Sequence, residues 1–401
     1  MAVAGIIAEY NPLHQGHVYL MEETRRRLGA ETGIVCVMSG DYVQRGDFAL
    51  VGKRARAAAA VESGADLVVE LPLPWAVSPA PGFALGAVMA LEAMGPVTHL
   101  VFGSESGSAG ALLRLVRSMD EPEFAQCLQQ ELRNGDSFAA AQQRAVAALL
   151  TPEEASLLQF PNNTLGAAYC RALLQLDSSI EPLAIPRVGA AHDSLEQDAR
   201  FPSASAIRSL LRQGERGMAL ARMAPAMAER YRQEEALGRA PVFWETCQRA
   251  ILARLRSMGP QDFAALDGGR EGLSNRLFQA AQQAPTLEEV LAQAKTKRYA
   301  LSRLRRMVLR AWLGLDVSLP GAMPYLRPLA ANGAGRALLA RMRKTAAVPI
   351  LMKAGQVRRL AEPARRLFEE EVRAAGLYAL AYPDLSAAWG GAEWRAGPVI
   401  L

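Results

Sequence analysis

Two histidines flank a glycine in the pattern His14-Gln-Gly16-His17, and side chains at this spacing could act together on a phosphate. The aliphatic run at residues 2–8 is typical of a buried parallel strand, and a loose helical period follows over residues 17–28. The pair is therefore expected at a strand-to-helix turn, where free N–H groups favour an anion. Gly16 lets the backbone approach a phosphate, and both imidazoles can donate to its oxygens. This pattern indicates attack on the α-phosphate of a nucleoside triphosphate.

Two other interpretations of the histidine pair stay open. An H-x-x-H spacing could hold a metal ion, or both residues could be ordinary surface histidines. No cysteine or further histidine lies nearby in the sequence to complete a metal site. We therefore predict that the protein itself holds no metal.

A second segment favours the same phosphate chemistry. Ser203 and Ser205 lie at the expected start of an amphipathic helix, and Arg208 lies in its first turn. Hydroxyls, helix N–H groups and a guanidinium together suit a triphosphate. Taken alone, the segment could be a plain capped helix with a solvated arginine. The histidine pair upstream favours the phosphate site.

Polar residues also follow the second expected strand, residues 33–38. Ser39 lies at its end, and Gln44, Arg45 and Lys53 come soon after it. These groups could bind a small carboxylate or the phosphates at the carboxyl edge of the sheet. Arg45 and Lys53 could equally be exposed charges of a loop and a helix.

Strand and helix patterns alternate along the first half of the chain. Strands are expected at residues 2–8, 33–38, 66–71, 99–102 and 182–185, with helices at 17–28, 52–63 and 83–94. Such alternation predicts an α/β fold, a Rossmann-like doubly wound parallel sheet. Residues 108–160 carry several helical patterns and are expected to form a helical insertion.

The pattern becomes almost purely helical after residue 207. We therefore predict a catalytic nucleotide-binding domain over residues 1–213 and a mainly α-helical domain over residues 214–401. A short strand could still occur within the last thirty residues. The chain has 401 residues, half of them hydrophobic, which is enough for two sizeable cores.

The composition argues against a membrane or secreted protein. The longest apolar runs are interrupted by glycine, proline or charge, and the first twelve residues lack a basic segment. The four cysteines are scattered and form no C-x-x-C pair, as expected for reduced thiols. A cytoplasmic location is the expectation.

Charge is distributed unevenly between the two halves. Residues 1–200 carry 14 Lys and Arg against 23 Asp and Glu, a balance of −9, and residues 201–401 carry a balance of +14. A basic half favours a polyanion such as RNA as a partner. The alternative is an arginine-rich solvated helical domain. The basic residues that crowd one helical segment, and that we expect to contact RNA phosphates, are Lys297, Arg298, Arg303, Arg305, Arg306 and Arg310.

These motifs together resemble a known family. The His14–His17 pattern is similar to the H-x-G-H signature of the nucleotidyltransferase superfamily. Residues 203–208 resemble its I-S-S-T-x-I-R motif, with Pro202 and Ala204 in place of an isoleucine and a serine. The ordered set of stretches at residues 9–17, 38–46, 101–105, 160–166 and 297–306 resembles the bacterial tRNA(Met) cytidine acetate ligases.

The resemblance implies catalytic roles for His14 and His17 and a set of ATP contacts. Gly103 and Asn162, which could otherwise be a turn glycine and an N-cap, become ATP contacts, with Asn163 as the fallback. The implied ATP-binding residues are Ile7, Ala8, Glu9, Tyr10, Asn11, Pro12, Leu13, His14, Gln15, Gly16, His17, Val18, Tyr19, Leu20, Gly103, Asn162 and Arg187, joined by Ser203, Ser205 and Arg208.

The resemblance also implies the reaction and the partners. ATP would activate acetate as acetyl-adenylate, with Mg²⁺ held through the phosphates. The acetyl group would pass to N4 of the wobble cytidine of elongator tRNA(Met), forming N4-acetylcytidine. No obligate protein partner is implied.

Two other functions are compatible with parts of this sequence. A small-molecule adenylyltransferase of the pantetheine-phosphate or nicotinate-mononucleotide type would use the same motif, but its chain is less than half this length. A non-catalytic RNA-binding protein with a relic nucleotide pocket would not need the intact histidine pair.

Overall fold

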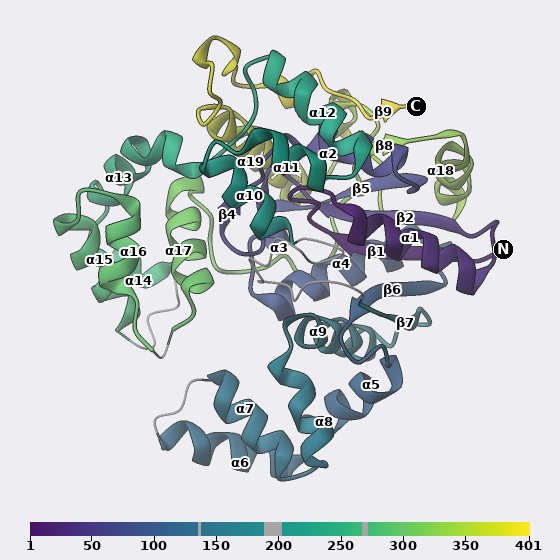
Figure 1. The fold of residues 1–401 in the computed structure, drawn as a ribbon, viewed down its shortest axis with the longest axis vertical. Helices are drawn as coiled ribbons and strands as arrows, with labels where there is room; N and C mark the ends of the chain where they lie inside the picture. Colours follow the sequence, from purple (N-terminus) through teal and green to yellow (C-terminus); the bar gives the residue numbers. More distant parts are fainter. Residues whose placement is uncertain (135–137, 188–202, 267–271, 298) are drawn as a thin grey trace.

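The computed structural model describes residues 1–134, 138–187, 203–266, 272–297 and 299–401. At its centre is a seven-stranded sheet with the strand order β7-β6-β1-β2-β5-β8-β9 (Figure 1). The strands are β1 Val3–Ala8, β2 Gly33–Ser39, β5 Leu67–Leu71, β6 His99–Ser104, β7 Glu181–Pro186, β8 Pro328–Ala331 and β9 Val399–Ile400. The five strands from β7 to β5 run parallel. The predicted Rossmann-like parallel sheet is confirmed.

Helices cover both faces of this sheet. On β2, Val35 and Val37 belong to one apolar core, whereas Ile34, Cys36 and Met38 belong to the other. Burial on both sides explains why the strands read as continuous apolar runs. The first face is covered by α4 Ala80–Met94, α9 Pro161–Gln175 and α18 Gly333–Thr345, beside the short α3 Leu73–Ala76. The second is covered by α1 Gln15–Leu28, α2 Lys53–Glu62, α10 Ala204–Arg212, α11 Arg216–Arg222 and α12 Pro225–Ala236.

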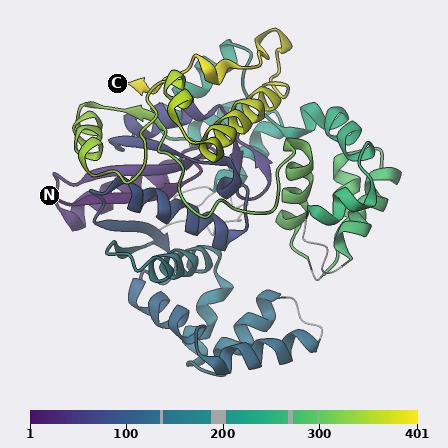
Figure 2. The same cartoon turned by 180° about the vertical axis from the view of Figure 1, so that it is seen from behind.

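The expected helical insertion is present. Its elements are α5 Ala109–Ser118, α6 Pro122–Arg133, α7 Phe138–Ala147, α8 Pro152–Ser156 and a 3₁₀ turn, η1 Leu157–Gln159. The helices α6, α7 and α8 lie beyond α9, at the bottom of the molecule in both views (Figures 1 and 2). They extend the layer that covers the β6–β7 end of the sheet.

A second group of helices forms a separate lobe beside the sheet (Figures 1 and 2). Its elements are η2 Trp244–Cys247, α13 Gln248–Arg256, α14 Pro260–Ala265, α15 Leu273–Gln283, α16 Leu287–Ala294 and α17 Leu301–Leu313. Their apolar faces share one core with Tyr42, Phe48 and Tyr378. The mainly helical character predicted for the second half of the chain is confirmed.

A small hairpin joins this lobe to the sheet. The two short strands β3 Tyr42–Val43 and β4 Asp47–Phe48 pair antiparallel. The Tyr42 hydroxyl donates to the carbonyl of Ala374, at 2.9 Å. Residues 44–47, which are the loop and the first residue of β4, are what we call the hairpin turn. Gln44 bonds Glu9 after β1 and Arg306 of α17, so this turn lies between the end of the sheet and α17.

The chain returns to the sheet after the helical lobe. Strand β8 pairs antiparallel with β5, and β9 pairs with β8. The remaining elements are η3 Ala354–Arg359, α19 Glu362–Ala379, η4 Leu385–Ala387 and η5 Ala392–Trp394. The sheet thus runs across the boundary placed near residue 213. The four-residue run Pro-Leu-Ala-Ala of β8 has no β-branched residue, so sequence gives little signal for it.

The strand order fixes where a ligand can bind. From β1 the chain proceeds to β2 and β5 on one side, then returns to β6 and β7 on the other. Ligands of open α/β sheets bind at such a switch point, beyond the carboxyl ends of the strands. Since β1 and β6 are neighbouring parallel strands, the turn after β1 and the end of β6 lie side by side at this switch point. Across the described residues, no helix combines the length and the apolar character that a membrane span requires.

Candidate active site

The turn after β1 places both histidines at the N-terminus of α1. His14 is the N-cap residue and is 6% exposed. The N–H of Gly16 donates to Nδ1 of His14, and the N–H of His14 donates to Nδ1 of His17, both at 3.1 Å. The two rings stack with centroids 3.8 Å apart. Each histidine therefore helps to cap the helix and to orient the other.

These bonds decide which ring nitrogen carries the proton. Because Nδ1 of each ring accepts a backbone N–H, the proton of the neutral imidazole lies on Nε2. His14 and His17 thus each present an Nε2–H donor beside the first turn of a helix. Donors at a helix N-terminus are what an α-phosphate requires.

The turn that carries these histidines is tightly held. Tyr10 has a φ of +47°, a left-handed conformation that tyrosine seldom adopts, and its ring stands edge-on to His17. Asn11 accepts a hydrogen bond from the N–H of Leu50 at 2.7 Å. The other implied ATP contacts of this stretch occupy the end of β1, the turn and the start of α1: Ile7, Ala8, Glu9, Pro12, Leu13, Gln15, Val18, Tyr19 and Leu20.

Glu9 is half-buried and accepts a hydrogen bond from a distant part of the chain. Its Oε1 accepts the N–H of Gln44, the first residue of the hairpin turn, at 2.8 Å. Burial raises the pKa of Glu9 above its usual value, although this hydrogen bond opposes the shift. The side chain therefore links β1 to the hairpin turn.

The end of β6 meets α9 and the end of β7 on the other side of the switch point. A Cβ on Gly103 would meet the Arg187 side chain at 3.3 Å, so glycine lets this side chain lie close to the end of β6. Asn162 donates to Glu105 at 2.6 Å, and its amide oxygen accepts from Arg187 at 3.4 Å. The structure thus brings Gly103, Asn162 and Arg187 together from three distant parts of the chain.

Asn163, the fallback for Asn162, serves the fold. Its amide oxygen accepts from the Ser104 hydroxyl at 2.7 Å and from the N–H of Ser106 at 3.1 Å. Its side chain is 1% exposed. Asn162, which faces Arg187, is the better placed of the two for a ligand.

Arg208 reaches the histidine turn from α10. Its guanidinium donates to Asn11 at 3.0 Å and to Asp47 at 2.9 Å, and the residue is 6% exposed. Ser203 is the N-cap of α10, and its hydroxyl accepts the N–H of Ala206. Ser205 is half-buried in the first turn. Pro202, which departs from the family motif, lies outside the described residues.

The four residues predicted to bind acetate or phosphate lie in different surroundings. Ser39 ends β2 with a buried hydroxyl that has no hydrogen-bond partner among the described residues. Gln44 and Arg45 are half-buried in the hairpin turn. Lys53 is 4% exposed and takes part in a buried ion cluster.

This ion cluster ties the C-terminal part of the chain to the sheet. Lys53 Nζ lies 2.7 Å from Glu70 and 3.1 Å from Glu393. Arg327 contacts Glu393 at 2.5 Å and Glu371 at 3.8 Å. Although burial opposes its charge, the neighbouring carboxylates raise the pKa of Lys53. In this structure Lys53 neutralises protein carboxylates, which differs from the predicted ligand contact.

Sequence reasoning missed Arg56, which organises the loops at the strand ends. It is fully buried, and it donates to the carbonyls of Glu9, Ser39, Gly40 and Val51. These carbonyls follow β1 and β2 and precede α2, so one guanidinium joins all three loops. The sequence signal that could have indicated a buried arginine is the run of four alanines, residues 57–60, that directly follows Arg56.

The basic residues predicted to contact RNA fall into two groups. Arg306 and Arg310 are 7% and 9% exposed, and Arg306 donates to the Gln44 carbonyl at 3.1 Å. Such burial leaves little surface for a phosphate. Lys297 is exposed and Arg303 and Arg305 are half-buried, whereas Arg298 lies outside the described residues.

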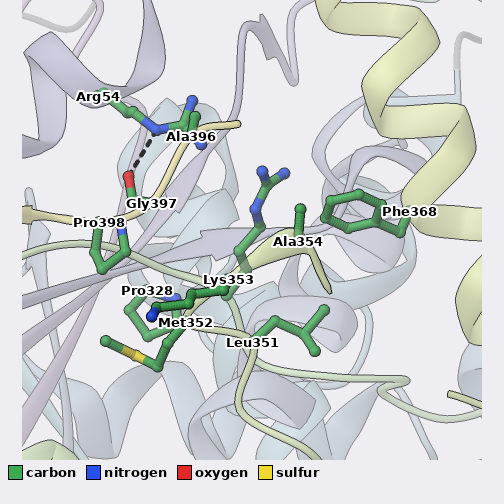
Figure 3. Close-up of a pocket in the computed structure, with 11 residues that line it drawn as sticks. Arg54, Pro328, Leu351, Met352, Lys353, Ala354, Phe368, Ala396, Gly397 and Pro398 are labelled. Atoms are coloured by element: carbon green, nitrogen blue, oxygen red, sulfur yellow. Dashed lines mark hydrogen bonds between the residues drawn. The ribbon is translucent and has the colours of Figure 1, made fainter. Parts of the chain in front are cut away.

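A hollow on another part of the molecule is shown in Figure 3. It lies between the C-terminal segment and the start of α2, where Arg54 donates to the Gly397 carbonyl at 3.0 Å. Phe368 and Leu351 form its apolar side. Its lining includes none of the residues predicted for the nucleotide. The described residues also contain no cluster of three or more His, Cys, Asp or Glu side chains that could hold a metal ion.

Comparison with known proteins identifies the class to which this site belongs. The family described as HIGH Nucleotidyl Transferase matches residues 1–391. The chain is therefore a member of the HIGH nucleotidyltransferases.

Individual relatives narrow the class further. The chain is 34% identical over 419 residues to the tRNA(Met) cytidine acetate ligase of Acetivibrio thermocellus, with 100% of both chains covered. It is similar over its full length to crystal structures of Thermotoga maritima TmcAL, at 32% identity. The TM-score is 0.95 for the apo form and 0.93 for the form bound with alpha-thio ATP. The chain belongs to the tRNA(Met) cytidine acetate ligase family.

Proposed function

We propose that this protein is an ATP-dependent ligase that acetylates N4 of the wobble cytidine of elongator tRNA(Met). The observation that carries the proposal is the pair of stacked imidazoles at the N-terminus of α1. Each presents an Nε2–H donor at the switch point of the sheet. The family to which the chain belongs supports the identity of the substrates.

In the first step, a carboxylate oxygen of acetate attacks the α-phosphorus of ATP. The new oxygen–phosphorus bond forms as the bond to the pyrophosphate oxygen breaks, giving acetyl-adenylate and pyrophosphate. Negative charge grows on the α-phosphoryl oxygens, where His14, His17 and the positive end of the α1 dipole would stabilise it. Alignment of the two substrates supplies a further part of the rate.

In the second step, the N4 amine of cytidine attacks the acetyl carbon. The carbon–nitrogen bond forms, the bond from that carbon to the phosphate oxygen breaks, and AMP leaves with the electron pair. The amine loses one proton to solvent. The product is N4-acetylcytidine in the tRNA.

The remaining ATP contacts lie on the two sides of the switch point. Gly103 carries no side chain that could obstruct the adenosine, and Asn162 and Arg187 would offer polar groups beside it. Arg208, next to Asn11, is placed for the triphosphate together with the start of α10. Mg²⁺ would be held through the phosphates and water, since hard cations with few protein ligands bind in this way.

The tRNA would lie against the basic helical lobe. Lys297, Arg303 and Arg305 keep exposed surface near the start of α17, and the second half of the chain carries a balance of +14. Phosphate contacts of this kind are not base-specific, so high salt should weaken binding. Tyr299, which could have stacked on a base, is 6% exposed and belongs to the core of the lobe. The cytoplasm, where tRNA and ATP occur, is the proposed location.

Two half-reactions test the proposal separately. Exchange of labelled pyrophosphate into ATP should require acetate and need no tRNA, because it reports the first step alone. Transfer of labelled acetate to tRNA should require ATP. Transfer of AMP to a small phosphate ester would favour an ordinary adenylyltransferase, and tRNA binding without either reaction would favour the non-catalytic alternative.

A further inference from the structure

The hairpin turn lies where three functional parts of the molecule meet. The N–H of Gln44 donates to Glu9 at the end of β1, and its carbonyl accepts from Arg306 of α17. Asp47, the last residue of the turn, contacts Arg208 of α10. The turn is therefore in contact with the histidine turn, with the helix proposed for the triphosphate and with the helix proposed for tRNA.

One carboxylate oxygen of Asp47 is shared between two arginines. Its Oδ2 lies 2.9 Å from Nη2 of Arg208 and 3.6 Å from Nη1 of Arg305. Its Oδ1 accepts the N–H of Phe48 at 2.8 Å, which fixes the plane of the carboxylate. The side chain of Asp47 is 10% exposed, that of Arg208 is 7% exposed and that of Arg305 is 30% exposed. The pair with Arg208 is thus sheltered, and the pair with Arg305 is open to competition.

Among the described residues, Asp47 is the carboxylate that forms an ion pair with Arg208. Another bond of the guanidinium goes to the neutral amide oxygen of Asn11, at 3.0 Å. Together the two acceptors hold the planar group beside the turn that carries His14. Removing the carboxylate would leave the buried cation with one neutral acceptor and the Phe243 ring, whose centroid is 5.4 Å away, and such a group moves to regain solvation.

Helix α17 is packed against the same turn through its backbone. Gly46 has a φ of +76°, and a Cβ there would lie 2.5 Å from the backbone nitrogen of Arg306. No side chain separates the turn from the helix at this point. A displacement of α17, or a change in the partners of Arg305, therefore reaches Asp47 directly.

We propose that Asp47 is a positioning residue, which holds Arg208 at the ATP site. Through Asp47, the position of Arg208 depends on whether tRNA is bound on α17. A tRNA phosphate that binds Arg305 competes with Asp47 for the Arg305 guanidinium. The strength of the ion pair between Asp47 and Arg208 therefore changes. The inference rests on the proposed function, since it assigns ATP to Arg208 and tRNA to α17. By linkage, ATP must change the affinity for tRNA by the same factor.

Equilibrium binding of ATP without acetate tests the proposal, because no adenylate can form. Asp47→Asn should weaken ATP binding about tenfold or more, since a charge-assisted bond is lost. The matched control is Asp66→Asn. Asp66 likewise holds an arginine, the half-buried Arg25, at 2.9 Å, but it precedes β5, at the end of the strand away from the proposed ATP site. ATP affinity of this control should equal that of the wild type.

A double-mutant cycle separates positioning from a general loss of structure. If Asp47 acts through Arg208, then Asp47→Asn should have no further effect on ATP affinity in an Arg208→Gln protein. Additive losses would overturn the proposal. Should Asp47→Asn not fold, Arg208→Lys carries the test, because lysine keeps the charge but cannot join Asn11 and Asp47. Wild-type ATP affinity in Arg208→Lys would contradict positioning.

Saturating bulk tRNA tests the coupling. It should change the Kd for ATP of the wild type about fivefold or more and leave that of Asp47→Asn unchanged. No change in the wild type, or the same change in both proteins, would overturn the coupling. These measurements use binding alone, so they are distinct from failure of the proposed reaction, which would show as missing acetyl transfer in the wild type.

Discussion

The N–H of His14 donates to Nδ1 of His17, and the imidazoles of the two residues stack with centroids 3.8 Å apart. This relationship makes the His17 ring a cap for the helix through Nδ1, and in the proposed function its Nε2 is a donor to the α-phosphate. The two roles reside on different atoms of the same ring. They can therefore be separated by mutation.

His17→Asn is predicted to separate them. The amide oxygen of asparagine can take the place of Nδ1 as acceptor for the His14 N–H, but nothing replaces the Nε2 donor. We expect acetate-dependent pyrophosphate exchange to fall about 100-fold or more, the usual loss for one transition-state donor, with a melting temperature close to that of the wild type. Exchange at the wild-type rate would contradict the assigned role of His17.

Asn162 and Asn163 are predicted to behave differently although they are neighbours. Asn162→Ala should raise KM for ATP, because its side chain faces Arg187 at the switch point. Asn163→Ala should instead lower the melting temperature, because its buried oxygen accepts from Ser104 and Ser106. Steady-state kinetics and thermal unfolding of both variants check this, and the reverse outcome would exchange the two assignments.

The surroundings of some site residues could be predicted from the sequence, whereas those of others could not, for physical reasons. The histidine turn and the N-cap Ser203 depend on local patterns at a strand end and at helix starts, so their positions could be predicted. Lys53 was expected at a ligand but lies among carboxylates 17 and 340 positions away, Glu70 and Glu393. Only the fold brings such partners together.

The burial of the α17 arginines likewise depends on contacts with distant parts of the chain. A helical period shows which positions are apolar, but it does not show what else the helix touches. Arg306 and Arg310 read as part of a basic surface, yet the hairpin turn and the rest of the lobe bury them. Strand β8 was missed because its pairing with β5 joins segments about 260 residues apart.

Gly46→Ala is predicted to loosen α17 from the hairpin turn. A methyl group there meets the backbone of Arg305 and Arg306, and alanine also resists the positive φ. Gly314→Ala is the matched control, since its φ is +66° with no atom within 4 Å of the new Cβ. We expect Gly46→Ala to lower the free energy of unfolding by about 1–3 kcal/mol more than the control, measured by urea unfolding. Equal losses would show that the close approach is unimportant.

Glu371 is predicted to make stability depend on pH. Burial raises the pKa of Glu371 to about 7, with Glu70 contributing, from an ordinary value of 4.5. Between these values the folded protein keeps a proton that the unfolded chain releases. The contribution of this group is therefore complete below about pH 4.5 and is lost as the pH rises through about 7.

Replacement of Glu371 by its neutral isostere, glutamine, checks the direction of this pH dependence. The melting temperature of the wild type should fall more between pH 5 and pH 8, as rough bounds of the window, than that of Glu371→Gln. The exposed neighbour Glu369→Gln should keep the wild-type dependence. An identical pH dependence in Glu371→Gln and the wild type would show that Glu371 does not titrate in this range.

Nucleoside analysis of the product shows whether the protein acetylates the wobble cytidine. Elongator tRNA(Met) transcripts with cytidine or uridine at the wobble position are incubated with the protein, ATP and isotopically labelled acetate, then digested and analysed by mass spectrometry. We expect labelled N4-acetylcytidine from the cytidine transcript alone, and only when ATP is present. Absence of labelled N4-acetylcytidine from the cytidine transcript, or its formation without ATP, would show that the protein is not an ATP-dependent cytidine acetate ligase.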